Sequence, residues 1–323
     1  MSKSVLVVEF IRGATHDGPG MRTTVFTKGC PLACNWCQNP ESINPNQENW
    51  YDVKKCIGCL ECMACPNNAL KSSEDGIKIL RDKCVACGIC TDICPAKALV
   101  PVGTRWSVDN LIHEVCKDEL YYNEFGGGVT VSGGEPLIHA DFLVEFFGKL
   151  REKGINTALD TSGFISEEAI KKVLPFVDTV LYDLKLMDDG AHKKLTGHSN
   201  EQILENVKLI ASYIRDALWE KNRKIQLWIR TPLIPGSTDS DENIKKIADF
   251  ISENLLDVME RWELCAFNSA CMIKYRKMQL SWPYAGMKSI NQNQAEVFSE
   301  IALSSGIPEE KFNITGIIVN YEF

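Results

Sequence analysis

The spacing of the cysteines constrains this chain more than any other feature. Eleven of the fourteen cysteines fall into three short runs, which comprise Cys30, Cys34 and Cys37; Cys56, Cys59, Cys62 and Cys65; and Cys84, Cys87, Cys90 and Cys94. Runs of this kind are typical of iron–sulfur clusters held by cysteine thiolates. Because a cubane cluster has four irons, the first run leaves one iron without a protein ligand, whereas each of the other runs can saturate a cluster. An open iron can bind and reduce a small molecule, so the sequence predicts one reactive cluster beside two closed ones.

Length and charge narrow the class of protein. A chain of 323 residues, 45% of them hydrophobic, is long enough for about two domains and a large core. Its net charge of −8, without a dense Lys/Arg run, argues against a nucleic-acid partner. No apolar stretch approaches the ~18 residues of a transmembrane helix, and the apolar start at 5–8 is interrupted by Glu9, too early for a signal peptide. Fourteen cysteines without a secretion signal predict metal-bound thiols in an oxygen-poor cytoplasm, and we expect a monomer with no membrane partner.

The chain divides into a small cysteine-rich module and a larger α/β unit. Residues 46–102 hold eight cysteines within 39 residues and few long apolar side chains, so we expect metal to hold this module together. Residues 1–45 and 103–323 form the larger unit, in which strand and helix patterns alternate. This alternation predicts a parallel sheet, open or closed into a barrel. The expected strands are 129–131, 157–159, 179–182, 226–229 and 316–319, and the expected helices are 142–150, the segment after Ser166, 203–214 and 244–251.

The first cysteine run has two interpretations. One is a structural zinc site with a distant fourth ligand, although zinc spacings usually come as two separated pairs. The other rests on a resemblance. The run, with Trp36 before its last cysteine, closely resembles the cluster loop of radical S-adenosylmethionine enzymes, and the leader at 16–22, His-Asp-Gly-Pro-Gly-Met-Arg, resembles that of the activating enzymes for glycyl-radical enzymes. The resemblance covers nearly the whole chain and implies a partial (β/α) barrel.

The resemblance also implies an activity. In that family the amine and carboxylate of S-adenosylmethionine chelate the open iron, and an electron cleaves the sulfonium to give a 5′-deoxyadenosyl radical. The radical then takes hydrogen from a backbone glycine of a partner glycyl-radical enzyme. Two alternatives stay open: a radical S-adenosylmethionine maturase of another protein or peptide, and an iron–sulfur electron-transfer protein with no chemistry of its own.

The other two runs have the spacing of a bacterial ferredoxin, and each ends in Cys-Pro. In such modules the fourth cysteine of each run ligates the cluster of the other run. We therefore expect one 4Fe–4S cluster on Cys56, Cys59, Cys62 and Cys94 and another on Cys84, Cys87, Cys90 and Cys65, which makes three clusters in all. The first of these runs departs slightly from the spacing, with two residues between its last cysteines. A pair of zinc knuckles is the alternative, and the ferredoxin-like insert can serve as an electron relay from a flavodoxin or ferredoxin, as structural support or as a docking surface.

A glycine-rich segment follows the strand expected at 129–131. In parallel α/β folds, ligands meet the carboxyl ends of the strands. There, Gly133 and Gly134 allow a close backbone approach, and Glu135 can pair with an ammonium group. A phosphate loop is the alternative, but the spacing fits neither of the usual nucleotide fingerprints. The segment resembles the Gly-Gly-Glu motif that holds the methionyl amine in radical S-adenosylmethionine enzymes.

Polar residues also follow the later strands. A helix cap is the alternative role for Asp160, and a surface salt bridge is the alternative for Asp183 and Lys185, which project to the same side of an extended segment. The resemblance implies that Asp160 and Asp183 lie near the cofactor, where a monovalent cation can bind, and that Lys185 lies in the active site. It further implies that Arg230 lies near the cofactor carboxylate or ribose, and that Asn268 replaces a cofactor-contacting histidine. We expect the remaining cysteines to be core thiols, namely Cys116, Cys265 and Cys271.

Overall fold

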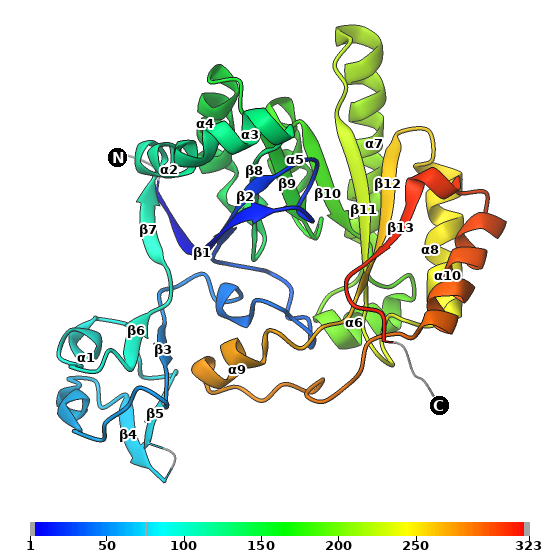
Figure 1. The fold of residues 1–323 in the computed structure, drawn as a ribbon. Coiled ribbons are helices and arrows are strands. Elements are labelled where there is room, and N and C mark those ends of the chain that lie inside the picture. The colour runs from blue at the N-terminus through cyan, green and yellow to red at the C-terminus, as the bar shows by residue number, and fades with distance from the viewer. Residues whose placement is uncertain (1–3, 75, 320–323) are drawn as a thin grey trace.

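A single curved sheet organises the protein. The computed structural model describes residues 4–74 and 76–319. Nine strands pair in the order β13-β12-β11-β10-β9-β8-β2-β1-β7, and every pair from β2 to β13 is parallel (Figure 1). Over the described residues the two edge strands, β7 and β13, do not pair, so the sheet is an open partial barrel. The strands are β1 (Ser4–Ala14), β2 (Arg22–Thr27), β7 (Thr104–Ser107), β8 (Gly128–Gly133), β9 (Asn156–Thr161), β10 (Thr179–Asp183), β11 (Gln226–Leu233), β12 (Met259–Ala266) and β13 (Phe312–Thr315).

Helices cover the outer face of the sheet. Side chains alternate between the two faces along each strand, so every second residue meets these helices. On β11, Leu227, Ile229 and Leu233 belong to the main apolar core, whereas Arg230 and Pro232 face the inside of the barrel. Successive strand residues point to opposite faces, so apolar and polar positions alternate. Outside residues 46–102, the α-helices of the described chain are α2 (Val108–Val115), α3 (Glu119–Phe125), α4 (Ala140–Glu152), α5 (Glu167–Val173), α6 (Asp189–Thr196), α7 (Glu201–Lys221), α8 (Asp241–Asn254), α9 (Met272–Met278) and α10 (Gln292–Ser304).

The predicted alternation of strands and helices is confirmed from β8 to α8, and the Ser166 side chain caps α5 by accepting from the Ala169 amide. The closing strand expected at 316–319 is wrong. It forms four residues earlier, as β13, where Phe312 packs on Trp262 with ring centroids 5.3 Å apart. Gly316 then leaves the extended region with a φ of 94°, and the Ile317 side chain is 71% exposed. The apolar run at 316–319 was therefore misleading, because packing of side chains against β12 decides which residues extend the sheet.

A small lobe interrupts the chain between β2 and β7. It contains two antiparallel pairs, β3 (Asn49–Tyr51) with β6 (Leu99–Pro101) and β4 (Leu70–Ser73) with β5 (Gly76–Ile79), and the short helix α1 (Ile89–Asp92). Its own small core combines cysteines with a few apolar side chains, and it lies at the lower left of Figure 1. We call residues 46–102 the insert.

A buried ionic chain joins the insert to the barrel. The fully buried Lys28 ammonium donates to the Glu48 carboxylate at 2.6 Å and to the Glu41 carbonyl at 2.7 Å. Glu48 also lies 3.5 Å from Arg81, which donates at 3.0 Å to the carbonyl of Met278 in α9. Burial lowers the pKa of Lys28, and the bond to Glu48 opposes that shift. The insert is thus anchored at both β2 and α9.

We predict that Glu48→Ala destabilises the fold by about 3–5 kcal/mol, because it leaves the buried Lys28 ammonium without its carboxylate. The free energy of unfolding in urea measures this effect. Glu300→Ala, at an exposed site on α10, is the control and should stay within about 0.5 kcal/mol of the parent. A loss below about 1 kcal/mol for Glu48→Ala would show that the ionic chain does not hold the two parts together.

Candidate active site

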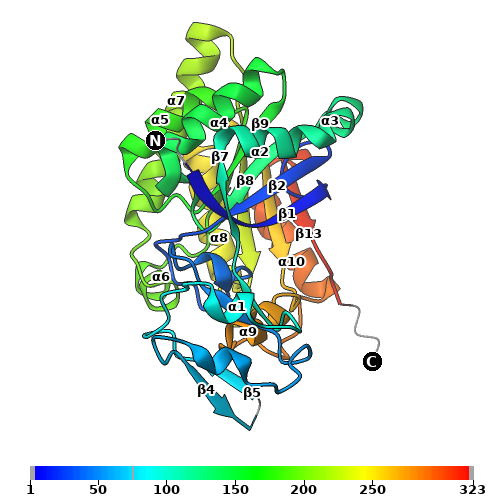
Figure 2. The ribbon, with the colours of Figure 1, turned by 90° about the vertical axis from the view of Figure 1, so that its left-hand side faces the viewer.

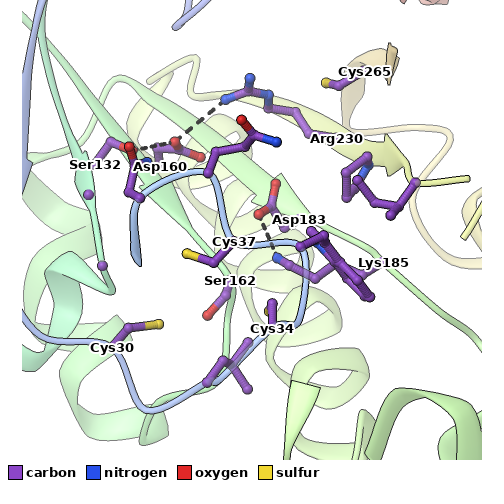
Figure 3. Close-up of a pocket in the computed structure, with 18 of the residues that line it drawn as sticks. Cys30, Cys34, Cys37, Ser132, Asp160, Ser162, Asp183, Lys185, Arg230 and Cys265 are labelled. Carbon is purple, nitrogen blue, oxygen red and sulfur yellow. Dashed lines mark hydrogen bonds and ion pairs between the residues drawn. The ribbon is translucent and has the colours of Figure 1, made fainter. Parts of the chain in front are cut away.

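A cavity of about 310 Å³ opens at the carboxyl ends of strands β8 to β12 (Figure 3). Its walls come from the first cysteine run and from the ends of these strands. Every residue that the sequence analysis placed at the first cluster or near the cofactor lines it, except Glu135. These residues are Cys30, Cys34, Trp36, Cys37, Gly133, Gly134, Asp160, Asp183, Lys185, Arg230 and Asn268.

The backbone holds the three cysteines of the first run around one space, as Figure 3 shows. The Cys30 amide donates to the Ile43 carbonyl at 2.9 Å, and the Cys37 amide donates to the Cys34 carbonyl at 3.0 Å. Burial raises the pKa of all three thiols, that of Cys30 to about 12. Such thiols ionise when a metal supplies the positive charge. The donor set therefore fits a cluster that binds through three thiolates.

A mononuclear site is not formed by this run. Within residues 4–74 and 76–319, no three His, Cys, Asp or Glu side chains are close enough together to hold a single metal ion. A cubane cluster makes a different demand, because each thiolate binds a different iron.

Two glycines bring the end of β8 against the end of β2. The Gly134 amide donates to the Thr27 carbonyl at 2.9 Å, and the next amide donates to the Gly29 carbonyl at 2.7 Å. Gly133 has a φ of 115°, and a Cβ on Gly134 would collide with the Gly29 carbonyl. Only glycine fits such a backbone contact. The contact positions the residue that directly precedes Cys30.

Glu135 has a different surrounding from the one that the sequence suggested. Its side chain is fully buried, and the carboxylate accepts from the Thr161 hydroxyl at 2.7 Å and from the Ser162 amide and hydroxyl at 2.9 and 2.7 Å. Burial raises its pKa, and these hydrogen bonds act in the opposite direction. Glu135 thus ties β8 to the end of β9 behind the cavity wall. Its contact with a cofactor amine stays a prediction.

Asp183 and Lys185 form an ion pair of 2.6 Å inside the cavity. The Lys185 side chain is only 8% exposed, so the surface salt bridge considered from the sequence is wrong. Burial lowers the pKa of Lys185, whereas the Asp183 carboxylate and the neighbouring Cys34 raise it. The raising effects are larger together, so the net shift of the pKa is upward. The ammonium therefore stays charged close to the first cysteine run.

A second charged pair joins β9 and β11, the strands on either side of β10. The Arg230 guanidinium is 3.5 Å from the Asp160 carboxylate, which accepts from the Ser132 hydroxyl at 2.6 Å. Burial raises the pKa of Asp160 to about 6, although Arg230 lowers it. The cavity therefore offers two cations and two carboxylates, Lys185 and Arg230 with Asp160 and Asp183. This charge pattern is complementary to a ligand that carries both an ammonium and a carboxylate.

The expectation for Cys265 is wrong. Its side chain lines the cavity beside Arg230 instead of packing in the core. On β12 the core positions are Trp262, Leu264 and Ala266, so Cys265 points inward. The alternation of side chains along a strand would have predicted this inward position from the sequence. Cys271 is buried with aromatic side chains and Cys116 packs at the edge of the main core, as expected for both.

Helix α9 contacts both the first cysteine run and the insert. The sequence did not predict this link. The Tyr275 hydroxyl donates to the Cys37 carbonyl at 3.0 Å. Just after the helix, the Gln279 amide group accepts from the Ile79 amide at 2.8 Å and donates to the Ile77 carbonyl at 2.6 Å, both on β5. The aromatic-rich segment 275–284 was the available signal, but it has no regular period. The insert is thus held at a defined position relative to the cavity.

The eight cysteines of the insert surround two small cavities. One is lined by Cys56, Cys59, Cys62 and Cys94, and the other by Cys65, Cys84, Cys87 and Cys90. The two runs therefore exchange their last cysteines, which is the crossed pattern of two-cluster ferredoxins. Donors approach the sulfur atoms: the Ala98 amide lies 3.3 Å from Cys94 Sγ, and the Asn49 side-chain amide lies 3.6 Å from Cys90 Sγ. These donor sets fit one closed cluster each.

Comparison with known proteins gives a consistent result. Residues 24–251 match the model of the radical SAM superfamily, where SAM denotes S-adenosylmethionine. The chain is 36% identical over 319 residues to the (2S)-3-sulfopropanediol dehydratase activating enzyme of Klebsiella oxytoca, covering 97% of this chain and 95% of that protein. It is 38% identical to the indoleacetate decarboxylase activating enzyme of Tractidigestivibacter scatoligenes, covering 82% and 81%. It is 34% identical to the 4-hydroxyphenylacetate decarboxylase activating enzyme of Clostridium scatologenes, covering 95% and 97%.

The open α/β sheet, the three-cysteine loop and the family match define the class: this chain belongs to the radical SAM superfamily. Within it, the chain belongs to the family of activating enzymes that these relatives represent. Across the described segments, no helix combines the length and apolar character that crossing a membrane requires.

We predict that Gly134→Ala weakens binding of S-adenosylmethionine more than tenfold and lowers the iron content of the first cysteine run. The added methyl group must push β8 away from the Gly29 carbonyl and so displace Cys30. Equilibrium dialysis and iron analysis of the reconstituted protein measure both effects. Gly148→Ala on α4, where the new methyl group meets Phe176 at an ordinary 3.7 Å, is the matched control. Unchanged affinity in Gly134→Ala would refute the importance of the β2–β8 contact.

Proposed function

We propose that this protein activates a glycyl-radical enzyme by removing hydrogen from a backbone glycine of that partner. The observation that carries the proposal is the cavity in which three partly buried cysteines meet the paired charges at the ends of β8 to β12. The names of the relatives, all activating enzymes, support it. When bound, a 4Fe–4S cluster and S-adenosylmethionine supply the reductive cleavage that yields a 5′-deoxyadenosyl radical.

The chain's own residues bind and orient this chemistry. Cys30, Cys34 and Cys37 hold the cluster and leave one position open for the cofactor. Arg230 and Lys185 offer positive charge to the cofactor carboxylate, and the backbone of the two glycines approaches its methionyl group. The carboxylates of Asp160 and Asp183 are suited to the ammonium or ribose groups and to a monovalent cation. The remaining proposed cofactor contacts are Trp36, Glu135 and Asn268.

Lys185 has a further proposed role. Its side chain lines the same cavity as Cys30 and Cys34. The Lys185 side chain is 8% exposed and that of Asp183 is 30% exposed, so the carboxylate holds an ammonium that is largely shielded from solvent. We propose that Lys185 orients the reacting end of the cofactor toward the glycine.

The insert is proposed to hold two further 4Fe–4S clusters, which makes three in the protein. Each of its two cavities has four cysteines and no open position. The anchoring of the insert at α9, beside the carbonyl of Cys37, supports a relay that brings electrons from a flavodoxin or ferredoxin. We further propose that the protein acts as a cytoplasmic monomer.

We predict that the anaerobically reconstituted protein holds about twelve irons and forms 5′-deoxyadenosine from S-adenosylmethionine with dithionite. Replacing Cys30, Cys34 and Cys37 together with Ala should remove about four irons and all cleavage. Cys116→Ala, which alters a cysteine outside the three runs, should change neither value. If the triple variant still cleaves the cofactor, the site assignment is incorrect.

Activation itself is tested with a glycyl-radical enzyme as the protein substrate. We predict that mixing the two proteins with S-adenosylmethionine and a reductant produces the electron paramagnetic resonance doublet of a glycyl radical on the partner. A maturase of another protein would form 5′-deoxyadenosine without that doublet. A pure electron-transfer protein would form neither product.

The relay is tested by replacing Cys56 and Cys59 with Ala, which should remove about four irons from the insert. We predict that turnover with reduced flavodoxin falls at least tenfold, while binding of S-adenosylmethionine at the first cluster is retained. Cys116→Ala is again the matched control. Unchanged turnover with flavodoxin in a folded variant would leave the insert with a structural or docking role only.

A further inference from the structure

The insert presents its apolar side chains to solvent in an unusual concentration. Six large apolar residues on its two cysteine loops are exposed, among them Ile57 at 68% and Val85 at 69%. Single exposed apolar side chains are ordinary, but a contiguous group marks an interaction surface. We call this group the cysteine-loop face, and its members are Ile57, Leu60, Met63, Val85, Ile89 and Ile93.

The two cysteine loops form one surface. Helix α1, in the second loop, packs against the 3-10 helix at Glu61–Ala64 in the first loop. Both loops lie on the side of the insert that points away from α9 in Figure 1, and Figure 2, viewed from that side, shows both toward the viewer. The opposite side of the insert is occupied, because β5 and Arg81 bond to the segment at the end of α9. The cysteine-loop face is therefore the side left open to a partner.

The proposed clusters come nearest to solvent on this same face. Of the eight cysteines of the insert, Cys59 and Cys87 are the exposed ones, one in each cavity. Ile57 lines the cavity of Cys59, and Val85 lines that of Cys87. A protein that exchanges electrons with either cluster gains the shortest path by covering these side chains. A partner that binds the insert without exchanging electrons gains nothing by contacting both exposed cysteines.

The charges of the face favour an acidic partner. Two exposed lysines, Lys54 and Lys55, precede the first run, Lys83 directly precedes the second, and Lys97 follows it. The exposed acidic residues on the same loops are Glu61, Asp82 and Asp92, so lysine is in slight excess there. The chain as a whole carries −8, which repels an acidic protein elsewhere. Lysines around a small apolar patch suit the brief encounters of electron-transfer proteins.

We propose that the cysteine-loop face is the docking surface for a small acidic electron-carrier protein. This inference rests on the proposed relay function, and it adds the place at which electrons enter. The carrier covers Ile57 and Val85, its acidic rim meets the four lysines, and its electron passes to the insert through Cys59 or Cys87. The inner side of the insert, fixed to α9, then faces the first cluster loop.

The test uses the full reconstituted protein and reduced flavodoxin as the probe. The double variant Met63→Ser/Ile93→Ser, at two members of the face that line neither cysteine cavity, should raise the KM for flavodoxin about tenfold, with iron content and dithionite-driven cleavage unchanged. The control Leu218→Ser/Trp219→Ser removes two exposed apolar side chains from α7, where Trp219 is 92% exposed, and should leave the KM unaltered. If the face variant and this control give the same KM, the docking proposal is overturned.

The charge of the face is tested separately. Lys54→Glu/Lys55→Glu should raise the KM for flavodoxin and flatten its dependence on salt, whereas Lys171→Glu/Lys172→Glu on α5 should not. Dithionite-driven formation of 5′-deoxyadenosine reports on the proposed function independently of docking, so failure of one is distinguished from failure of the other. If the face variants instead lower the glycyl-radical yield with dithionite while flavodoxin turnover is normal, the face binds the glycyl-radical enzyme and our assignment is wrong.

Discussion

The close approach of the ends of β2 and β8 is the constraint on which the site depends. Gly133 and Gly134 lie so near to the backbone at 27–29 that no side chain fits between them. Two backbone hydrogen bonds then hold the strand end directly before Cys30. The first cysteine loop therefore begins from a fixed point at the carboxyl edge of the sheet. Any displacement of either strand would move the cluster ligands relative to the rest of the cavity.

A second level of order comes from buried charge. The Glu135 carboxylate accepts hydrogen bonds from donors at the end of β9. Asp160 on β9 pairs with Arg230 on β11, and Asp183 at the end of β10 pairs with Lys185 two residues later. Burying these groups is costly unless they are paired and hydrogen-bonded. The pairs are thus oriented before a ligand arrives. A buried ion pair also joins the barrel to the insert, because the Lys28 ammonium pairs with the Glu48 carboxylate.

Much of this arrangement was predictable from the sequence, because it depends on local patterns. The alternation of strands and helices, the polar residues at strand ends and the cysteine spacing all act over a few residues. What failed depends on contacts between distant segments. The shift of the last strand to β13 follows from packing on β12, and the burial of Glu135 follows from donors on another strand. The inward position of Cys265 is the exception, because the alternation of side chains along β12 could have predicted it. The link from α9 to the insert joins residues about 200 positions apart, for which no local pattern exists.

The central claim is that the radical generated in the cavity takes hydrogen from a glycine of the partner. Isotope transfer tests it most directly. The partner glycyl-radical enzyme is prepared with deuterated glycine and incubated anaerobically with this protein, reductant and S-adenosylmethionine, and the 5′-deoxyadenosine is analysed by mass spectrometry. We predict that one deuterium enters the 5′-deoxyadenosine as the glycyl radical forms. Cleavage of the cofactor with no deuterium in the product would contradict it.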